Sequence, residues 1–348
     1  MISAQAKIRL DNPSAVLTAL RDHMAEHDID THDVEDVVVA HIRAGEARLH
    51  AGDIELSLEA RAPSQSQLEN LASFLASHVL EIAHPEKPGI EWSGLQAGAR
   101  FSDFREMMVT HVEDLAPHMR RISLKGEDLG RFDTEEDLHV RLFFPPPGQE
   151  PLWPVRGADG LVQSVPEERK PAVRKYTIRR INAGAGTLDI DFVIHEVAGP
   201  GSDWAKGAAP GMRIGMAGPG GRSAKQADWM LLAGDETALP AIARILERLP
   251  ATAKGTVVLV ADAPKEAIAL QYPPGFEIRW VHHQPGLADF VATVVAVDIP
   301  QDCTRFCWAG AELKYIQAIR RHWRDTIGLS SNEQLAVAYW RKGQQQDR

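Results

Sequence analysis

The sequence predicts a multidomain fold: a small α+β domain, an antiparallel six-stranded β-barrel and a C-terminal α/β doubly wound domain. Three observations predict it. Two amphipathic helical patterns mix with short strands over residues 1–96, short strands separated by turns fill residues 100–225, and strands alternate with helical stripes after that. A chain of 348 residues is long enough for two or three domains. We therefore expect domains at 1–96, 100–225 and 226–345.

The N-terminal domain is expected to place two helices on an antiparallel sheet. Asp11-Asn12-Pro13 is a helix-start signal, because Asn caps helices and proline is tolerated in the first turn. His23 and His27 are spaced i, i+4, which suits a metal pair, but no acidic or cysteine pattern completes a site, so an exposed polar face is the simpler interpretation. The expected strands are 4–10, 37–42, 47–51, 54–58 and 90–92, and the apolar helix positions are Val16, Leu17, Leu20, Met24, Leu68, Leu71, Leu75 and Val79.

The barrel and the α/β domain are expected from their strand patterns. The expected barrel strands are 107–112, 119–124, 139–144, 175–181, 187–194 and 212–217. A long insertion with many prolines and glycines runs from Pro145 to Pro171, and a loop of that length is usually functional or mobile. The expected parallel strands are 229–233, 257–261, 277–281, 306–309 and 336–340, with helices between them, one of them at 287–294.

Composition excludes several function classes. Lys and Arg number 38 and Asp and Glu 48, and the resulting net charge of −10 disfavours nucleic acid or an anionic membrane as a partner. There is no apolar run of about eighteen residues and no basic, apolar leader, so neither a membrane span nor a secretory signal is expected. Cys303 and Cys307 are expected to be free thiols rather than a disulfide or a metal pair, which indicates a reducing, cytoplasmic setting.

Two stretches carry the chemistry. In the strand 174–177 (Arg-Lys-Tyr-Thr), side-chain alternation puts Arg174 and Tyr176 on one face, where they offer a cation for a phosphate and a ring for a planar cofactor. The second stretch, 231–240, reads as a buried strand, a tight loop and a helix that begins at Pro240. Such a corner directs backbone N–H groups and a helix N-terminus toward a nucleotide.

Seven motifs follow one another in order. They are 174–177, 191–195 (Asp-Phe-Val-Ile-His), 199–205 (Gly-Pro-Gly-Ser-Asp-Trp-Ala), 218–221 (Gly-Pro-Gly-Gly), 234–240 (Gly-Asp-Glu-Thr-Ala-Leu-Pro), Trp308-x-x-x-Glu312 and 339–343 (Tyr-Trp-Arg-Lys-Gly). Together they closely resemble the siderophore-interacting proteins, a family of FAD-dependent ferric-siderophore reductases with a ferredoxin-reductase-like fold. The resemblance covers residues 100–343. Residues 1–96 resemble a small bacterial domain of unknown function, on Arg21-Asp22-His23, a hairpin at Gly52 and Glu91-Trp92, and this implies no activity.

The resemblance implies roles for individual residues. Arg174 is expected on phosphate, Tyr176 against the isoalloxazine and Thr177 at the ring edge. The other implied cofactor residues are Asp191, Phe192, Val193, His195, Ser202, Trp204, Ala205, Thr237 and Trp340. The residues implied near the nicotinamide are Gly234, Asp235, Glu236, Trp308 and Glu312, although two acids facing a pyrophosphate would repel it. The implied substrate cations are Arg141, Arg341, Lys342 and Arg222, because ferric siderophores are often anionic.

The implied activity is reduction of a ferric siderophore, with electrons passing from NADH or NADPH through FAD and Fe(II) being released. A ferredoxin is the alternative donor. No catalytic proton-transfer residue and no metal ligand are expected, because the cofactor carries the electrons. Two other interpretations stay open: a flavin reductase or electron-transfer protein with a different acceptor, and a non-catalytic siderophore-binding module. Reduction of the flavin by a nicotinamide would exclude the second of these.

Overall fold

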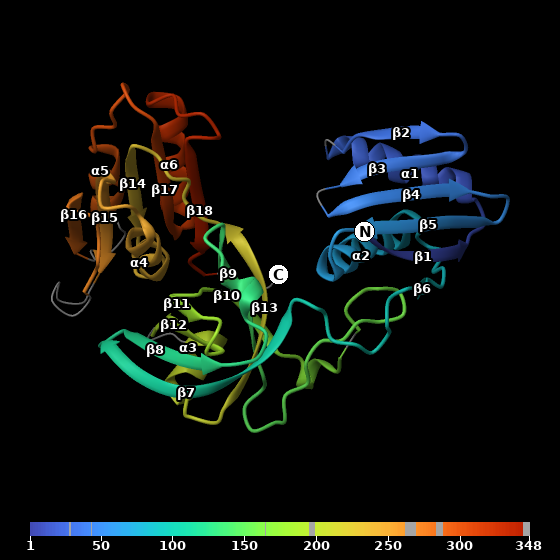
Figure 1. Ribbon diagram of the computed structural model, residues 1–348, viewed down its shortest axis with the longest axis horizontal. Helices are drawn as coiled ribbons and strands as arrows, with labels where there is room; N and C mark the ends of the chain where they lie inside the picture. The colour runs from blue at the N-terminus through green and yellow to red at the C-terminus, as the bar shows by residue number, and fades with distance from the viewer. Residues whose placement is uncertain are drawn as a thin grey trace. The chain divides into compact units, whose positions relative to one another are not determined.

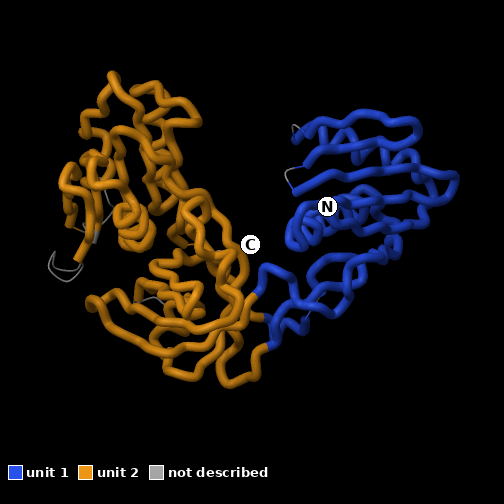
Figure 2. The backbone as a smooth tube through the Cα atoms, in the orientation of Figure 1, with its two compact units in different colours: residues 1–104, 152–170 blue, residues 105–151, 171–348 orange. Residues whose placement is uncertain are grey.

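The structure is a computed structural model that describes residues 1–27, 29–42, 44–163, 165–194, 199–261, 269–282 and 288–343. It divides into two compact units (Figure 2). The first comprises Met1–Phe104 and Leu152–Lys170, and the second comprises Arg105–Pro151 and Pro171–Arg348. The chain therefore passes between the units at three points, and the second unit contains both the barrel and the α/β sheet.

Within its described residues, the first unit is a six-stranded antiparallel sheet of order β2-β3-β4-β5-β1-β6, with helices α1 and α2 packed on one face (Figure 1). The elements are β1 (Ile2–Arg9), α1 (Pro13–Glu26), β2 (Thr31–Val34), β3 (Val37–Ile42), β4 (Gly45–Ala51), β5 (Glu55–Ala62), α2 (Gln65–Ile82) and β6 (Trp92–Ser93). Buried and solvent-facing residues alternate along β1 and β5, and the buried ones meet the apolar stripes of both helices. The predicted α+β fold is confirmed. Strand β2 was not predicted, because its residues are mostly exposed and carry no apolar alternation.

Part of the long insertion folds into the first unit. The indole of Trp92 donates to Asp159 O at 3.0 Å, and Ser73 Oγ donates to Gly160 O at 2.6 Å. Arg156 and Glu69 form an ion pair whose side chains are only 2% and 4% exposed. The first unit is thus completed by a segment that interrupts the barrel in the sequence.

The barrel of the described chain has seven antiparallel strands, one more than expected, in the order β10-β9-β13-β7-β8-β12-β11. Its elements are β7 (Phe104–Ala116), β8 (Met119–Lys125), β9 (Asp137–Phe144), β10 (Ala172–Thr177), β11 (Arg180–Asn182), β12 (Thr187–Val193), α3 (Pro200–Gly207) and β13 (Arg213–Arg222). The expected strand 175–181 is divided at Ile178 and Arg179. Ile178 N donates to Leu138 O in β9 at 3.0 Å, and Arg179 N donates to Asp189 O in β12 at 2.8 Å. These two residues therefore connect the two ends of the sheet and close the barrel.

The described residues beyond 226 form a five-stranded parallel sheet of order β16-β15-β14-β17-β18, as the doubly wound prediction requires. Its elements are β14 (Trp229–Gly234), α4 (Leu239–Arg248), β15 (Lys254–Ala261), β16 (Gly275–His282), α5 (Ala288–Val295), β17 (Arg305–Glu312), α6 (Leu313–Arg321), a π-helical turn (His322–Thr326) and β18 (Gln334–Trp340). Helices α5 and α6 pack on one face. Helix α4 packs on the other, where Ile242 of α4, Leu232 of β14 and Leu138 of β9 share one core. Since α4 lies between sheet and barrel, nearly all of its side chains are buried.

None of the helices in the described ranges combines the length and the apolar character needed to span a bilayer.

Candidate functional site

An aromatic cluster lies between β9, β10, β12 and α3. The ring of Tyr176 lies 4.4 Å from that of Phe192, and the ring of Phe144 lies 5.9 Å from Tyr176 and 5.6 Å from Trp204, measured between centroids. Tyr176 is half-buried, and burial raises the pKa of its phenol, so the phenol stays neutral at physiological pH. The cluster therefore holds the partly exposed ring of Tyr176 on an apolar base.

The first turn of α3 packs against this ring. Gly199 precedes the helix and Pro200 opens it, and the N–H groups of a helix start lack intrahelical acceptors. A Cβ on Gly201 would lie 2.1 Å from Tyr176 Oη, so only glycine allows the phenol to approach the turn this closely. The positive end of the helix dipole thus lies beside the ring of Tyr176.

Arg174 supplies a full positive charge at the same place. Its guanidinium donates to Val173 O at 2.7 Å, and its charge acts to lower the pKa of Tyr176, against the larger effect of burial. Within the described ranges, no carboxylate forms an ion pair with Arg174. A half-exposed ring, a cation and a helix N-terminus are complementary to the planar ring and the diphosphate of FAD. In addition, the buried indole N–H of Trp204 has no partner among the described residues. These residues therefore fit a flavin dinucleotide.

Asp191 is engaged by cations of the protein itself. Arg121 donates to its two carboxylate oxygens at 2.7 and 2.8 Å, and Arg179 lies 3.9 Å away. Arg179 also donates to Glu247 of α4 at 2.7 Å. Because the side chains of Asp191 and Arg179 are each only 4% exposed, this chain of ion pairs is a buried connection between the barrel and α4. Asp191 thus helps to fix the position of β12, and its predicted role at the cofactor stays a prediction.

The remaining residues implied for the flavin lie close by. Phe192 is fully buried in the aromatic cluster, whereas Val193 faces the core shared with α4. Ser202 and Ala205 are buried on the inner side of α3. His195 lies outside the described residues.

Asp235 is the centre of the loop that follows β14. Its Oδ1 accepts hydrogen bonds from Thr237 N (3.0 Å) and Thr237 Oγ1 (2.5 Å), and its Oδ2 accepts from Glu312 N (3.2 Å) and the Trp340 indole (2.8 Å). Burial raises the pKa of Asp235, and these hydrogen bonds oppose the shift. The carboxylate therefore points into the protein and connects the loop to β17 and β18. Glu236, the second acid of the loop, is half-buried.

Other residues implied for the nicotinamide lie beneath or beside this loop. Trp308 is fully buried, so any effect that it has on a nucleotide passes through its neighbours. A Cβ on Gly234 would lie 2.6 Å from Ala238 Cβ, so glycine allows the loop to pass close to the start of α4. Glu312 caps α6 by accepting a hydrogen bond from Lys314 N at 2.7 Å. The group gathers at the carboxyl ends of β14 and β17, where nucleotides bind in parallel α/β sheets.

Sequence reasoning missed His139 and Tyr339. His139 Nε2 lies 2.7 Å from Tyr339 Oη, and Tyr339 lies directly before Trp340 in β18. Burial lowers the pKa of His139 to about 4, and the charges of Lys175 and Arg244 act in the same direction. The only available signal was the place of Tyr339 in the last motif, because a contact across 200 residues leaves no local pattern.

The implied substrate cations occupy different strands. Arg141 and Lys175 are direct cross-strand partners in β9 and β10, so these two exposed side chains share a face. Like charges placed opposite each other destabilise a sheet, so the pair itself adds no stability to β9 and β10. Arg222 is exposed at the end of β13, and Arg341 and Lys342 are exposed directly after β18. Sequence reasoning had not assigned Lys175 to the substrate.

Metal ligands and thiols add nothing to this site. Across the described ranges, no group of three or more His, Cys, Asp or Glu side chains is arranged to hold a metal ion. Both Cys303 and Cys307 are free, and burial raises the pKa of the Cys307 thiol to about 12. That thiol is therefore protonated at physiological pH.

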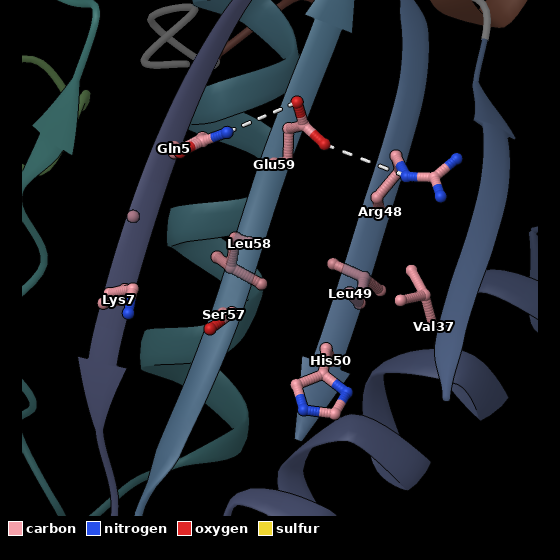
Figure 3. A pocket seen from close by; sticks show the side chains of 10 residues that line it. Gln5, Lys7, Val37, Arg48, Leu49, His50, Ser57, Leu58 and Glu59 are labelled. Carbon is pink, nitrogen blue, oxygen red and sulfur yellow. Dashed lines mark hydrogen bonds and ion pairs between the residues drawn. The ribbon is translucent and has the colours of Figure 1, made fainter. Parts of the chain in front are cut away.

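The first unit has a shallow hollow of about 220 Å³ over β1, β5, β4 and β3 (Figure 3). Its polar side chains pair with one another: Gln5 donates to Glu59 at 3.4 Å, and Arg48 lies 3.8 Å from the same carboxylate. Lys7 of β1 pairs with Glu55 of β5 at 3.3 Å. The hollow is thus a solvated sheet face with internally matched charge, and we assign no ligand to it.

The fold and the site define a class of protein: a flavoprotein whose barrel holds the flavin beside a parallel sheet that binds a nucleotide. Comparison with known proteins identifies the family. Residues 108–223 match the model of the siderophore-interacting FAD-binding domain, and residues 227–343 match that of the siderophore-interacting protein. Residues 5–93 match an uncharacterized protein family conserved in bacteria, DUF2218.

Individual relatives agree with these models. The chain is 32% identical over 240 residues to ferric vibriobactin reductase ViuB of Vibrio cholerae serotype O1, covering 67% of this chain and 88% of that protein. It is 33% identical over 243 residues to the NADPH-dependent ferric-chelate reductase of Escherichia coli K12, covering 68% and 92%. The crystal structure of the siderophore-interacting protein SipS from Aeromonas hydrophila superposes with a TM-score of 0.60 at 31% identity, covering 70% and 93%. The chain belongs to the siderophore-interacting protein family.

Proposed function

We propose that this protein is an FAD-dependent ferric-siderophore reductase that takes electrons from NADPH or NADH. The observation that carries the proposal is the convergence of Tyr176, Arg174 and the start of α3 in the barrel, which shares one compact unit with the parallel sheet. The names of the Vibrio cholerae and Escherichia coli relatives support a ferric chelate as the acceptor, and the second favours NADPH as the donor. We assign this chemistry to residues 100–225 and 226–345 and a separate role to residues 1–96.

The residues of the chain hold and orient the reactants. Arg174 and the N–H groups of α3 would bind the FAD diphosphate, Tyr176 would pack on its ring, and Thr177 would lie at the ring edge. When bound, FAD accepts a hydride and passes electrons on one at a time. The loop around Thr237 would orient the nicotinamide.

The substrate side is cationic. Arg141 and Lys175 present two adjacent positive charges on one exposed face of the barrel. Such a pair attracts an anionic ferric chelate and raises its rate of encounter, an effect that added salt weakens. Arg222, Arg341 and Lys342 are further candidates. Fe(III) enters as part of the substrate, and Fe(II) leaves because hard oxygen donors hold the reduced ion less tightly.

The donor and the setting are also inferred. NADPH and NADH reduce a flavin from the sheet side, whereas a reduced ferredoxin, the alternative donor, would have to dock on the surface. The free cysteines and the nicotinamide requirement support a cytoplasmic location.

The test is the visible spectrum of the purified protein, taken anaerobically, then with NADPH, NADH or reduced ferredoxin, then with a ferric siderophore. A flavin spectrum that bleaches and recovers while a chelator traps Fe(II) is the expected result. Bleaching without reoxidation by any ferric chelate would favour a reductase with another acceptor. A flavin that no donor bleaches would favour a non-catalytic binding module, and absence of flavin would contradict the cofactor assignment.

A further inference from the structure

A partly buried chain of hydrogen bonds joins three strands of the second unit. Tyr339 Oη, on β18, lies 2.7 Å from His139 Nε2, on β9, and the two rings meet edge to face at 5.2 Å. The side chain of Thr177, on β10, also hydrogen-bonds to Tyr339. Thr177 and His139 are direct cross-strand partners, and Thr177 is 5% exposed. The last strand of the sheet thus reaches into the flavin motif of the barrel.

The charge states give this chain a direction. Burial lowers the pKa of His139 to about 4, so the imidazole is neutral at pH 7 and its Nε2 can accept a hydrogen bond. Burial raises the pKa of Tyr339, so the phenol keeps its proton and donates it to His139. Because the single phenolic proton is donated to His139, Tyr339 Oη can only accept in its hydrogen bond with the Thr177 hydroxyl, so Thr177 is the donor. The hydroxyl of Thr177 is therefore held in one orientation.

Two glycines create the space for these rings. A Cβ on Gly310 would lie 2.9 Å from Tyr339 Cε1 and 3.0 Å from the ring of Trp308. A Cβ on Gly221, whose φ is +77°, would lie 2.3 Å from His139 Nδ1. Larger residues at either position would displace a ring. The contact between Tyr339 and His139 therefore depends on glycine at both positions, Gly310 beside the tyrosine ring and Gly221 beside the imidazole.

The same strand is fixed to the nucleotide loop. Trp340, the residue after Tyr339, donates through its indole to Asp235 at 2.8 Å, and Asp235 also holds Thr237. Consecutive side chains of β18 thus contact the flavin motif and the loop that follows β14. One strand sets the spacing between the two.

We propose that Tyr339 and His139 are positioning residues for hydride transfer, which hold the Thr177 hydroxyl and align the flavin edge with the nicotinamide loop. The inference rests on the proposed function, because Thr177 is taken to lie at the flavin edge. Neither residue needs to touch the nicotinamide or the ferric chelate. Loss of the Tyr339–His139 hydrogen bond should therefore slow the reduction of the flavin by NADPH, which requires alignment. Reduction by dithionite and reoxidation by a ferric chelate do not require it and should be unchanged.

The experiment compares Tyr339→Phe with Tyr272→Phe, a control on a tyrosine that is 46% exposed. Each purified protein is saturated with FAD and reduced anaerobically, once with NADPH and once with dithionite, which requires no alignment. We expect Tyr339→Phe to unfold cooperatively, to bind FAD within about threefold of the parent, and to be reduced by NADPH about tenfold more slowly, the scale of one hydrogen bond. Its reduction by dithionite and reoxidation by a ferric chelate should be unchanged, and the visible circular dichroism of its flavin should differ from that of the control.

His139 supplies the second pair of variants. His139→Gln keeps a hydrogen-bond acceptor for Tyr339 and should recover most of the NADPH rate, whereas His139→Leu should behave like Tyr339→Phe. Reduction of Tyr339→Phe by NADPH at the parent rate would overturn the inference. Equal slowing with NADPH and dithionite, or loss of FAD, would overturn it too, since the residue would then be only structural.

The parent protein separates this inference from the proposed function. Reduction of its flavin by NADPH without transfer to any ferric chelate would refute the proposed substrate. The positioning role of Tyr339 and His139 could still be tested, because the variants are compared by their rates of flavin reduction. A parent without flavin would refute both.

Discussion

Replacing Asp235 with Asn tests whether the nucleotide loop is organised by a buried carboxylate. The carboxylate accepts hydrogen bonds from two backbone N–H groups, of Thr237 and Glu312, one on each oxygen, together with the Thr237 hydroxyl and the Trp340 indole. An amide has one oxygen, so in either orientation its NH2 faces a backbone donor. The hydroxyl can rotate, but a backbone N–H cannot. At least one buried donor is left without a partner.

The expected cost is about 2–3 kcal/mol, from one or two unsatisfied donors at about 1–3 kcal/mol each, less the relief of burying a neutral group instead of a charge. The assay is urea unfolding followed by tryptophan fluorescence. Asp228→Asn is the matched control, because Asp228 also accepts from the backbone and hydroxyl of a threonine, Thr304, but at the surface. Its loss of stability should be much smaller. An Asp235→Asn protein as stable as the control would refute the argument.

Three further predictions concern the barrel and the first unit. Between pH 6.5 and 4, His139 is protonated in the unfolded chain but stays neutral in the folded one, because burial lowers its pKa to about 4. The free energy of unfolding should therefore fall by about 3 kcal/mol as the pH drops through that range, and His139→Gln should flatten this part of the plot of unfolding free energy against pH. Arg141→Ala should raise the KM for an anionic ferric siderophore by about threefold to tenfold and leave reduction of a neutral dye unchanged, whereas Lys125→Ala, an exposed cation on β8, should change neither. Deleting residues 1–96 alone removes the partners of residues 152–170 and leaves the Arg156 guanidinium without Glu69, so this variant should aggregate. Replacing residues 152–170 with a short linker as well should restore a monodisperse protein on gel filtration. A monodisperse single deletion would contradict the last prediction.

Periodicity was enough for the architecture. Alternation in β5 and the apolar stripe of α2 gave the first unit, and repeated strand and helix signals gave the parallel sheet. Periodicity failed to predict elements whose residues show no alternation of buried and exposed positions. Strand β2 is mostly exposed, and the break at Ile178 and Arg179 depends on hydrogen bonds to β9 and β12 rather than on a turn residue. Periodicity also gave no sign that residues 152–170 fold with the first unit.

The site was predictable only as far as its residues lie together in the sequence. Tyr176 and Arg174 are two residues apart, so strand alternation alone pairs them. Arg141 and Lys175 become neighbours only through the register of β9 and β10, which no local pattern specifies. His139 and Tyr339 are 200 residues apart. The roles of single residues remain predictions, whereas the fold that gathers them is established.

The acids of the nucleotide loop show how sequence and structure answer different questions. From the sequence, Asp235 in place of a glycine looks unfavourable for an anionic nucleotide, because a carboxylate would repel a pyrophosphate. In the structure the same carboxylate is turned inward and satisfied by four donors, so its charge is compensated before any ligand arrives. A glycine-rich loop offers bare backbone to a phosphate, whereas this loop is fixed by the Asp235 side chain and carries a half-buried Thr237. Nucleotide selectivity should therefore depend on Thr237 and its surroundings more than on backbone N–H groups, and Asp235 should affect it only through the shape of the loop.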